Sequence, residues 1–445
     1  MEKFKKIWFL LLLLMLFLPM TQTCFHWVDE EPLEGAFVNM KKPQVTLKTL
    51  YNETAQDSLQ TWCTEQTGFR NSMIRVNNQV LLSLYGKTPN SSVVRGKDRY
   101  HYFGNLYIKS YIGESYLGAE KIHKKAQKLK LIQDMLDTKG VTVLPVFTVG
   151  KASYYPELIP DEYLEKRRET NNYNEYLSAF DELGVEIIDF NKYLCDLKDT
   201  ETYPFFCNLG THWTAYAASL AMDSLVCFME HKTQKKHVHA VIESFDTTYL
   251  LNQDDELCRI MNLMFPLRHN TVYQPVFSYT KGYKPKVLAI SDSYWWTVYA
   301  DRITLPQNLF SNGGFWFYNK TVYPQRKPKK NVESLDYKKE IEGQEFILLV
   351  CTEATNNKWP WGFSERYLTA YENAFKNKSP EQYDAADSLY LAFRNAEIEN
   401  NIQRIKDSPK WLENVTTSAD EKGITLEQAL WNAGEYTYRA DIKPK

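Results

Sequence analysis

The sequence predicts an α/β fold with a mainly parallel sheet flanked by helices. Two observations support this fold class. Short β-branched runs alternate with helical stretches through the middle of the chain, and such alternation requires crossover connections between parallel strands. Hydrophobic residues make up 44 % and charged residues 24 % of the chain, which is typical of a folded globular protein and excludes a disordered body. Ligand sites of such sheets lie beyond the carboxyl ends of the strands.

The chain begins with an export segment. Lys3, Lys5 and Lys6 precede a stretch without charge over residues 7–28, which is long enough for either a cleaved signal or an uncleaved membrane anchor. Both alternatives stay open, and lipid modification of Cys24 is a third. In each case the rest of the chain is expected outside the cytoplasm, in the periplasm or cell envelope, possibly anchored in the inner membrane by residues 7–28.

Further elements follow in order along the chain. Residues 41–92 predict loosely amphipathic helices, and residue 93 opens a strand-and-turn region. Periodic apolar residues predict later helices over residues 121–139, 161–183, 213–230 and 294–300. Apolar and β-branched runs predict strands over residues 141–149, 185–190, 287–290 and 346–350.

The last part of the chain predicts a small helical appendage, because Ser379-Pro380, Ser408-Pro409 and Thr425 with Gln428 are typical helix starts. The expected domains are an export segment (1–28), a helical lead-in (29–92), the α/β domain (93–378) and a helical tail (379–445).

Charge and aromatic content narrow the function classes. The 53 Lys and Arg nearly cancel the 55 Asp and Glu, so a broadly basic nucleic-acid protein is excluded. Aromatic residues make up 14 %, which favours either an aromatic-rich core or a surface for flat-faced ligands such as sugars. Outside the cytoplasm the six cysteines after Cys24 could form disulfides or stay buried thiols, and the sequence leaves this open.

Ser293 is the candidate nucleophile. It follows the strand of residues 287–290 and precedes a helix, where backbone N–H groups converge and can hold an oxyanion. The alternative is that Asp292 and Ser293 are ordinary helix caps. The candidate base is His212, because a helix start disfavours the imidazolium and keeps the ring neutral. Its alternative is a structural histidine.

Three aromatic residues and one lysine are candidate substrate contacts. Lys151, in a loop after the strand of residues 141–149, could meet an anionic substrate or a carboxylate, or be an ordinary solvated lysine. Trp316 and Tyr318 follow Gly313-Gly314 and could stack on sugar faces, as could Trp213, or they form a buried aromatic strand.

The order of these motifs resembles the SGNH-hydrolase-like acetyltransferases of the alginate O-acetyltransferase (AlgX/AlgJ) type over roughly residues 93–370. The resemblance also includes Gly96-Lys97-Asp98-Arg99 at the start of the α/β domain. It implies an SGNH-like sheet, a Ser-His-Asp triad and transfer of acetyl groups to an exported polysaccharide, with Ser293 as nucleophile and His212 as base. The family usually has Asp two residues before the histidine, where this chain has Gly210. Glu353, or next Asp292, is the expected substitute; otherwise the chain is a Ser-His dyad or inactive.

The resemblance also implies partners. Because acetyl-CoA is not available outside the cytoplasm, a multi-pass membrane O-acyltransferase is expected to supply the acetyl group, with no cofactor bound to this chain. No metal is expected, since His231, His237 and His239 lie beside a lysine-rich run that predicts a solvated face. Two other functions stay open: a catalytically impaired polysaccharide-binding or scaffold protein of an acetylation complex, and an SGNH carbohydrate esterase.

Overall fold

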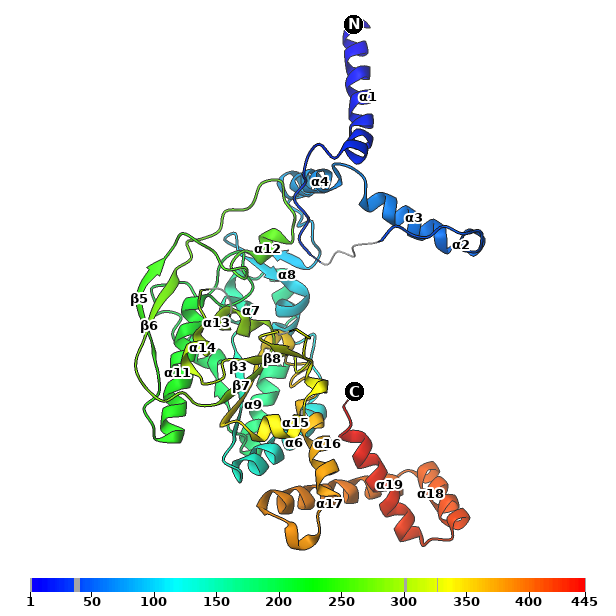
Figure 1. Cartoon of the computed structure of the whole chain (residues 1–445), viewed down its shortest axis with the longest axis vertical. Coiled ribbons are helices and arrows are strands. Elements are labelled where there is room, and N and C mark those ends of the chain that lie inside the picture. Colours follow the sequence, from blue (N-terminus) through cyan, green and yellow to red (C-terminus); the bar gives the residue numbers. More distant parts are fainter. Residues whose placement is uncertain (1, 36–40, 300–301, 326, 445) are drawn as a thin grey trace. The chain divides into compact units, whose positions relative to one another are not determined.

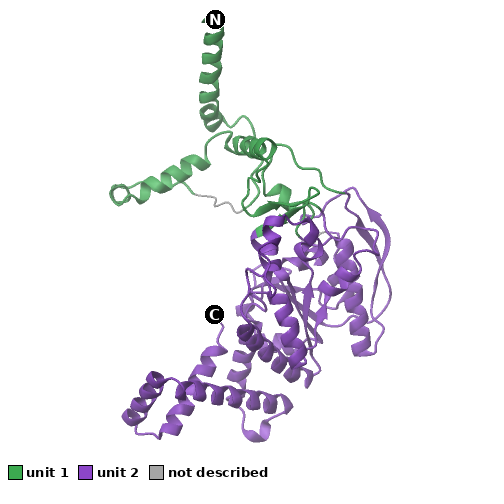
Figure 2. Ribbon diagram, turned by 180° about the vertical axis from the view of Figure 1, so that it is seen from behind, with its two compact units in different colours: residues 1–104, 208–211, 254–270 green, residues 105–207, 212–253, 271–445 purple. Residues whose placement is uncertain are grey.

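The computed structural model describes residues 2–35, 41–299, 302–325 and 327–444 and forms two compact units (Figure 2). Unit 1 comprises residues 1–104, 208–211 and 254–270, and unit 2 comprises residues 105–207, 212–253 and 271–445. Chain contacts define these units, and the expected domain boundaries at residues 28, 92 and 378 stay predictions.

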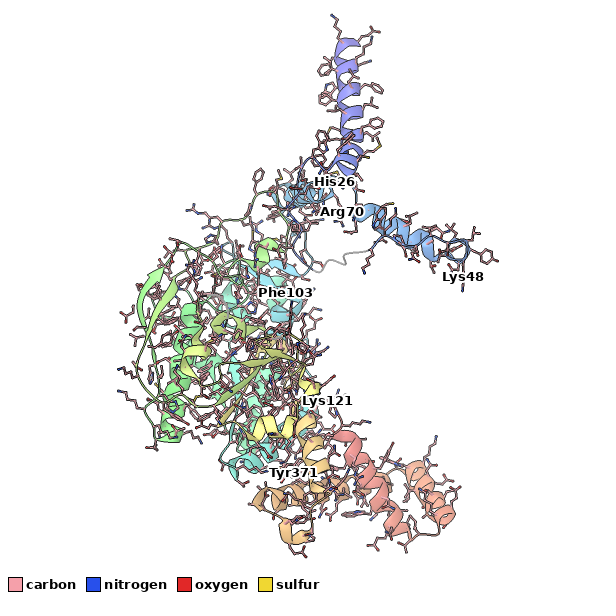
Figure 3. All side chains as sticks on the ribbon, in the orientation of Figure 1. His26, Lys48, Arg70, Phe103, Lys121 and Tyr371 are labelled. Carbon is pink, nitrogen blue, oxygen red and sulfur yellow. The ribbon has the colours of Figure 1, made fainter. Side chains whose placement is uncertain are left out.

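Unit 1 contains the predicted amino-terminal helices and the first strand-and-turn region, with residues 36–40 outside the described part. Its elements are α1 (Glu2–Phe25), α2 (Leu47–Tyr51), α3 (Thr54–Glu65), α4 (Arg70–Tyr85), the antiparallel pair β1 (Val93–Arg95) and β2 (His101–Phe103), and α12 (Glu256–Arg259). Among the described residues α1 is the one helix long and apolar enough to cross a membrane, by length and composition. Its apolar side chains are exposed around the ribbon (Figure 3).

Helix α4 is tied both to the chain after α1 and to residues 254–270. Glu30 Oε1 accepts hydrogen bonds from Ser72 N at 2.8 Å and Ser72 Oγ at 2.6 Å. Asn78 Nδ2 donates to Met261 O at 2.9 Å. These bonds join segments that are distant in sequence, so unit 1 folds around long-range contacts.

Unit 2 contains the predicted sheet, in the strand order β4-β3-β10-β7-β8-β9. The strands are β3 (Thr142–Thr148), β4 (Ile188–Asp189), β7 (Val287–Ser291), β8 (Phe315–Phe317), β9 (Thr321–Tyr323) and β10 (Phe346–Thr352). All neighbours are parallel except β8 and β9. Every residue of β7 and β10 is buried, as expected for central parallel strands covered on both faces. The predicted α/β class is confirmed.

Helices cover this sheet and place loops at the carboxyl ends of its strands (Figure 1). α6 packs on β3 and α9, while α10 packs on β3 and α11. The helices are α5 (Lys109–Tyr111), α6 (Ala119–Asp137), α7 (Lys151–Tyr154), α8 (Asp161–Leu164), α9 (Asn172–Leu183), α10 (Phe190–Asp196), α11 (Ala215–Thr233), α13 (Trp296–Tyr299), α14 (Leu305–Leu309), α15 (Tyr337–Glu342) and α16 (Phe363–Phe375). A hairpin of β5 (Ala240–Asp246) and β6 (Gln274–Tyr279) was not predicted.

Two predicted elements are wrong in extent. The single helix expected over residues 161–183 is two helices, because the Asn171 side chain accepts from Asn174 N and starts α9 anew. The strand expected over residues 185–190 keeps only Ile188–Asp189, because the Asp189 side chain accepts from Lys192 N and starts α10.

Two elements beside the site also differ. The helix expected from residue 213 begins at Ala215 with Thr214 as its cap, so His212 precedes it. The stretch expected to be helical over residues 294–300 is a 3-10 turn at Ser293–Trp295 followed by α13, and Ala300 lies outside the described residues.

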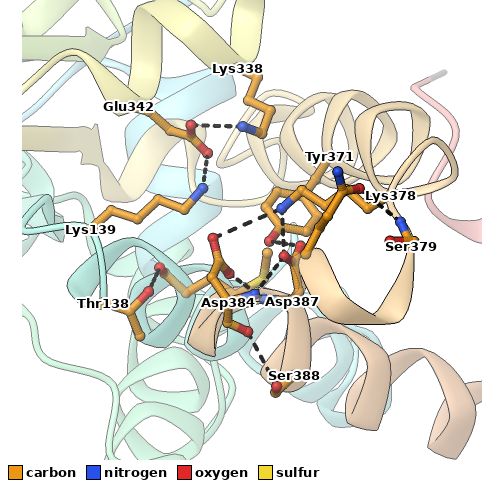
Figure 4. Close-up of polar contacts among 12 residues, drawn as sticks. Thr138, Lys139, Lys338, Glu342, Tyr371, Lys378, Ser379, Asp384, Asp387 and Ser388 are labelled. Carbon is orange, nitrogen blue, oxygen red and sulfur yellow. Dashed lines mark hydrogen bonds and ion pairs between the residues drawn. The ribbon is translucent and has the colours of Figure 1, made fainter.

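The tail is helical, as predicted, and it packs on the sheet domain. Its helices are α17 (Ala385–Lys406), α18 (Pro409–Lys422) and α19 (Leu426–Asp441), with α17 in contact with both α6 and α19. At the start of α17 the buried Asp387 carboxylate accepts from Tyr371 Oη at 2.7 Å and Lys378 Nζ at 2.5 Å (Figure 4). Burial opposes its ionisation, but the bonds from Lys378, Asp384 N and Tyr371 outweigh burial and lower the pKa of Asp387 to about 2.

We expect Asp387→Ala to destabilise the chain by roughly 2–3 kcal/mol, because Tyr371 and Lys378 lose a charged acceptor. Urea unfolding at pH 7 measures the change. Asp420→Ala, on an exposed position of α18, is the matched control and should change stability by less than about 0.5 kcal/mol. Equal effects of the two substitutions on stability would contradict the inference that the Asp387 carboxylate stabilises the start of α17.

Candidate active site

Ser293 lies at the carboxyl end of a central strand. β7 ends at Ser291, and Ser293 begins the 3-10 turn that follows. The Asp292 side chain caps this turn by accepting from Tyr294 N at 3.0 Å. Asp292 is fully buried, whereas Ser293 is partly exposed. The turn therefore presents the serine side chain and keeps the preceding carboxylate inside.

Asp292 also ties the turn to the neighbouring strand β10. Its Oδ2 atom accepts from Thr352 N at 2.9 Å, from Thr352 Oγ1 at 3.1 Å and from Thr355 Oγ1 at 2.6 Å. A carboxylate with several donors of this kind is held in a single orientation. Both oxygens of Asp292 thus accept hydrogen bonds that fix the nucleophile turn, and its predicted role as the orienting carboxylate for His212 stays a prediction.

The structure brings His212 to Ser293. The Nε2 atom of His212 lies 2.9 Å from Ser293 Oγ, within hydrogen-bond distance. The ring is 8 % exposed and lies against the buried Tyr294, with 5.0 Å between ring centroids. If the neutral ring carries its proton on Nδ1, Nε2 accepts from the serine hydroxyl. Two residues that are 81 positions apart in sequence therefore have the geometry of a nucleophile and its base.

Tyr318 is a third residue at this site. Burial raises the pKa of its hydroxyl to about 12, and Asp292 adds to the effect, while hydrogen bonds from the side chain and backbone amide of Ser293 oppose it. The hydroxyl therefore stays protonated at neutral pH and lies beside the nucleophile. The sequence singled out Tyr318 for sugar stacking, and its contact with Ser293 was not predicted.

The other three candidate substrate contacts are buried. Trp213 Nε1 donates to Tyr294 O at 3.2 Å, and Trp316 packs on Tyr337 in the core with 5.3 Å between ring centroids. Lys151 is 1 % exposed and its Nζ donates to Cys207 O at 2.7 Å, so it is not a solvated loop lysine. The predicted substrate contacts of these side chains stay predictions.

Glu353 lies just past β10, at the same sheet edge, and is buried. It accepts from Gly150 N at 3.1 Å, from Asn191 Nδ2 at 2.6 Å and from Ser153 Oγ. These donors follow β3 and β4, so the carboxylate joins three strand ends. Its predicted role as the orienting carboxylate for His212 stays a prediction.

A polar cavity of about 220 Å³ opens beside Glu353. Its walls include Ser153, Asn191, Tyr173 and Arg167, whose guanidinium lies 4.4 Å from the ring centroid of Tyr111. Burial raises the pKa of Glu353 to about 7, although the bonds from Ser153, Gly150 and Asn191 lower it in part. The sequence analysis did not predict this cavity. Ser153, Asn191 and Glu353 each follow a predicted strand, and this shared position at strand ends could have indicated it.

The histidines near the lysine-rich run divide into two environments. His237 is buried, with Nε2 2.8 Å from Thr233 Oγ1, so the prediction of a solvated face is wrong for it. His239 is partly exposed and its Nδ1 lies 2.7 Å from Asp223 Oδ1, close to Cys227.

Comparisons with known proteins agree with this architecture. Residues 93–269 match the family model described as "SGNH hydrolase-like domain, acetyltransferase AlgX", a range that includes His212 and ends before Ser293. The predicted resemblance is thereby confirmed. No curated protein matches the chain.

Several solved structures are similar to the chain. The O-acetyltransferase domain of Pseudomonas putida AlgJ has 14 % sequence identity, with 67 % of this chain and 99 % of that chain covered and a TM-score of 0.37. Pseudomonas aeruginosa AlgX has 11 % sequence identity, with 64 % of this chain and 68 % of that chain covered and a TM-score of 0.42. Bacillus cereus PatB1 with a sulfonyl adduct has 10 % sequence identity, with 59 % of this chain and 97 % of that chain covered and a TM-score of 0.35.

The pKa of Glu353 predicts a pH-dependent stability. Because the folded pKa of about 7 exceeds the unfolded value of 4.5, the protonated form stabilises the fold below pH 4.5, and this contribution is lost as the pH rises through 7. We expect wild type to lose about 3 kcal/mol over this interval relative to Glu353→Gln, which cannot ionise.

Urea unfolding of both proteins at several pH values between 4 and 8 measures the difference. Glu340→Gln, at an exposed position of α15, is the control and should follow wild type. Parallel pH profiles of wild type and Glu353→Gln would show that the carboxyl ionises normally.

Proposed function

We propose that the chain moves an acetyl group, through an acyl-enzyme on Ser293, to hydroxyl groups of an exported polysaccharide, because residues 93–269 match the family model of the SGNH hydrolase-like domain of the acetyltransferase AlgX. The observation that carries this proposal is the 2.9 Å distance between Ser293 Oγ and His212 Nε2. A serine hydroxyl is a weak nucleophile until an adjacent base takes its proton.

The reaction has two steps of ester exchange. Ser293 Oγ attacks the acetyl carbonyl carbon, His212 Nε2 takes the hydroxyl proton, and the leaving group of the donor departs with that proton. A sugar hydroxyl then gives its proton to His212 and attacks the acetyl-Ser293 ester. The serine oxygen leaves and recovers the proton, which restores the resting enzyme.

Tyr318 is placed to assist both steps. Its neutral hydroxyl lies beside Ser293, where negative charge develops on the carbonyl oxygen of each tetrahedral intermediate. A donor at this position stabilises the intermediate more than the ground state. The role is that of an oxyanion-stabilising group.

The acetyl donor is a partner protein in this proposal, a multi-pass membrane O-acyltransferase that passes acetyl groups across the membrane, and the chain binds no cofactor of its own. The apolar helix α1 supports a place beside that partner, because it has the length and composition to cross a membrane.

The contact between His212 and Ser293 favours catalysis over the impaired scaffold, which has no need of such a pair. An esterase would use the same acyl-enzyme with water as the second nucleophile. The choice between transferase and esterase therefore depends on the acceptor, and it is made by comparing acetyl transfer with acetyl release in the presence of an oligosaccharide.

We expect Ser293→Ala and His212→Ala each to lower acetyl turnover by at least about 10³-fold, because each removes one member of a cooperative pair. Turnover is followed with an aryl acetate as donor and an oligosaccharide as acceptor, with separate measurement of acetyl-sugar and free acetate. Ser334→Ala and His231→Ala, at exposed positions, are the matched controls. Residual activity near the wild-type level in either site variant would refute the mechanism.

Tyr318→Phe removes only the hydroxyl beside Ser293. We expect kcat to fall about 10²-fold with little change in KM, because the lost donor acts in the transition state. Tyr323→Phe is the control, because it removes the same hydroxyl group from a tyrosine on strand β9 and not from the one beside Ser293. An unchanged kcat in Tyr318→Phe would leave the tyrosine with a packing role only.

The end of α1 is integrated into unit 1, which supports retention of the helix as an anchor. Gly68 N donates to Thr23 Oγ1 at 2.7 Å. A Cβ atom at Gly68 would lie 2.5 Å from Gln22 Cβ and 2.6 Å from Pro19 O. Gln22 is 4 % exposed although the rest of the helix is open. A helix that was cleaved away would leave this packing without its partner.

We expect Gly68→Ala to lower the melting temperature of the membrane-extracted chain by several degrees, because its Cβ overlaps with α1. Gln60→Ala on the exposed side of α3 is the control. Intact-mass analysis of the same sample shows whether residues 1–25 are present. A chain that lacks them, or an unchanged melting temperature, would argue for a cleaved signal.

A further inference from the structure

A cavity of about 370 Å³ lies within unit 1, and its described lining residues belong to that unit alone. Arg95, Arg99 and Arg268 line it together with the buried residues His101 and Asn208. Among the described residues that line it there is no carboxylate. Nor does any of the three guanidinium groups form an ion pair in the part of the chain that the structure describes. Three positively charged residues thus line a cavity that has no acidic residue among its described lining.

The β1–β2 hairpin holds two of these arginines at the cavity. Arg95 ends β1 and is paired across the strands with His101. Arg99 lies in the turn, where Asp98 and Arg99 both have positive φ, 49° and 65°. Non-glycine residues in this region cost about 1 kcal/mol or more each, and such strain is concentrated at functional sites. The hairpin therefore contains a strained turn, and this turn places Arg99 at the cavity.

The backbone of the third arginine, Arg268, is anchored by a separate set of hydrogen bonds. Asn208 and Asn270 exchange two hydrogen bonds, from Asn208 N at 3.0 Å and from Asn270 N at 2.9 Å. Asn208 Nδ2 also donates to Arg268 O at 3.2 Å. Because Asn208 is only 6 % exposed, the backbone of Arg268 is anchored to a buried residue. The lining residues come from four separate segments of the chain, within residues 79–83, 95–101, 208–209 and 267–268, and the three arginines among them are exposed.

We propose that this cavity is a binding site for an oxyanion carried by a sugar unit, either a carboxylate or a phosphate. Guanidinium groups present paired N–H donors that match the oxygens of both groups. Gln79 and Ser83 add uncharged polar groups to the wall for sugar hydroxyls. The volume is at the low end of the ~300–1,000 Å³ of small-molecule pockets, which suits one or two sugar rings. The site does not depend on acetyl transfer by Ser293.

Calorimetric titration of the full chain in detergent, with glucuronic acid, glucose 6-phosphate and glucose as probes, tests the proposal. We expect at least one anionic sugar to bind 10-fold or more tightly than glucose, and its affinity to fall as salt rises. The comparison of the two anionic sugars identifies the preferred oxyanion. Arg268→Gln should weaken this binding about 10-fold, and Arg99→Gly should do the same while relieving the strained turn.

Lys87→Gln is the matched control, since it removes one positive charge from an exposed position of the same unit outside the cavity. A melting temperature of Arg99→Gly at or above that of wild type shows that its loss of binding is not a loss of folding. The proposal is overturned if no anionic sugar binds, if glucose binds equally well, or if both arginine variants bind as wild type does.

Discussion

The geometry of the candidate active site depends on one buried carboxylate. Asp292 caps the turn at Ser293 through Tyr294 N and reaches across to β10 through Thr352 and Thr355. Two adjacent parallel strands are thereby joined at their carboxyl ends, where the nucleophile leaves the sheet. Since a displacement of about 1 Å is enough to impair a catalytic pair, the 2.9 Å approach of His212 to Ser293 requires a turn fixed in this way.

The same sheet edge holds a second carboxylate in a different environment. Glu353 is bonded to groups that follow β3 and β4, whereas Asp292 is bonded to Tyr294 N after β7 and to Thr352 on β10. The predicted role of either carboxylate beside His212 stays a prediction. The other carboxylates among the buried described residues are Asp254, Glu372 and Asp387, of which the last two form hydrogen bonds between α16 and α17.

The central sheet and the Ser-His pair were accessible from the sequence because they rest on local signals. Apolar periodicity predicted α6, apolar and β-branched runs predicted β3, β7 and β10, and strand-end positions drew attention to Ser293 and Lys151. The first residues of α9 and α10 were not predictable in the same way, because each helix start is set by one capping side chain, Asn171 for α9 and Asp189 for α10. The arginine cavity depends on hairpin strain and on long-range bonds of Asn208, which no local pattern reveals. Much of the aromatic excess serves packing, as in the cluster of Phe147 with Trp359.

The central claim is that Ser293 carries the acetyl group during turnover. Rapid acid quench of the chain with an aryl acetate, followed by peptide mass analysis, measures acetylation at that residue directly. The account predicts an added acetyl group on the Ser293 peptide that disappears when an oligosaccharide acceptor is present and fails to form in His212→Ala. Acetyl turnover by the wild-type chain with no modification of Ser293 at any quench time would contradict it.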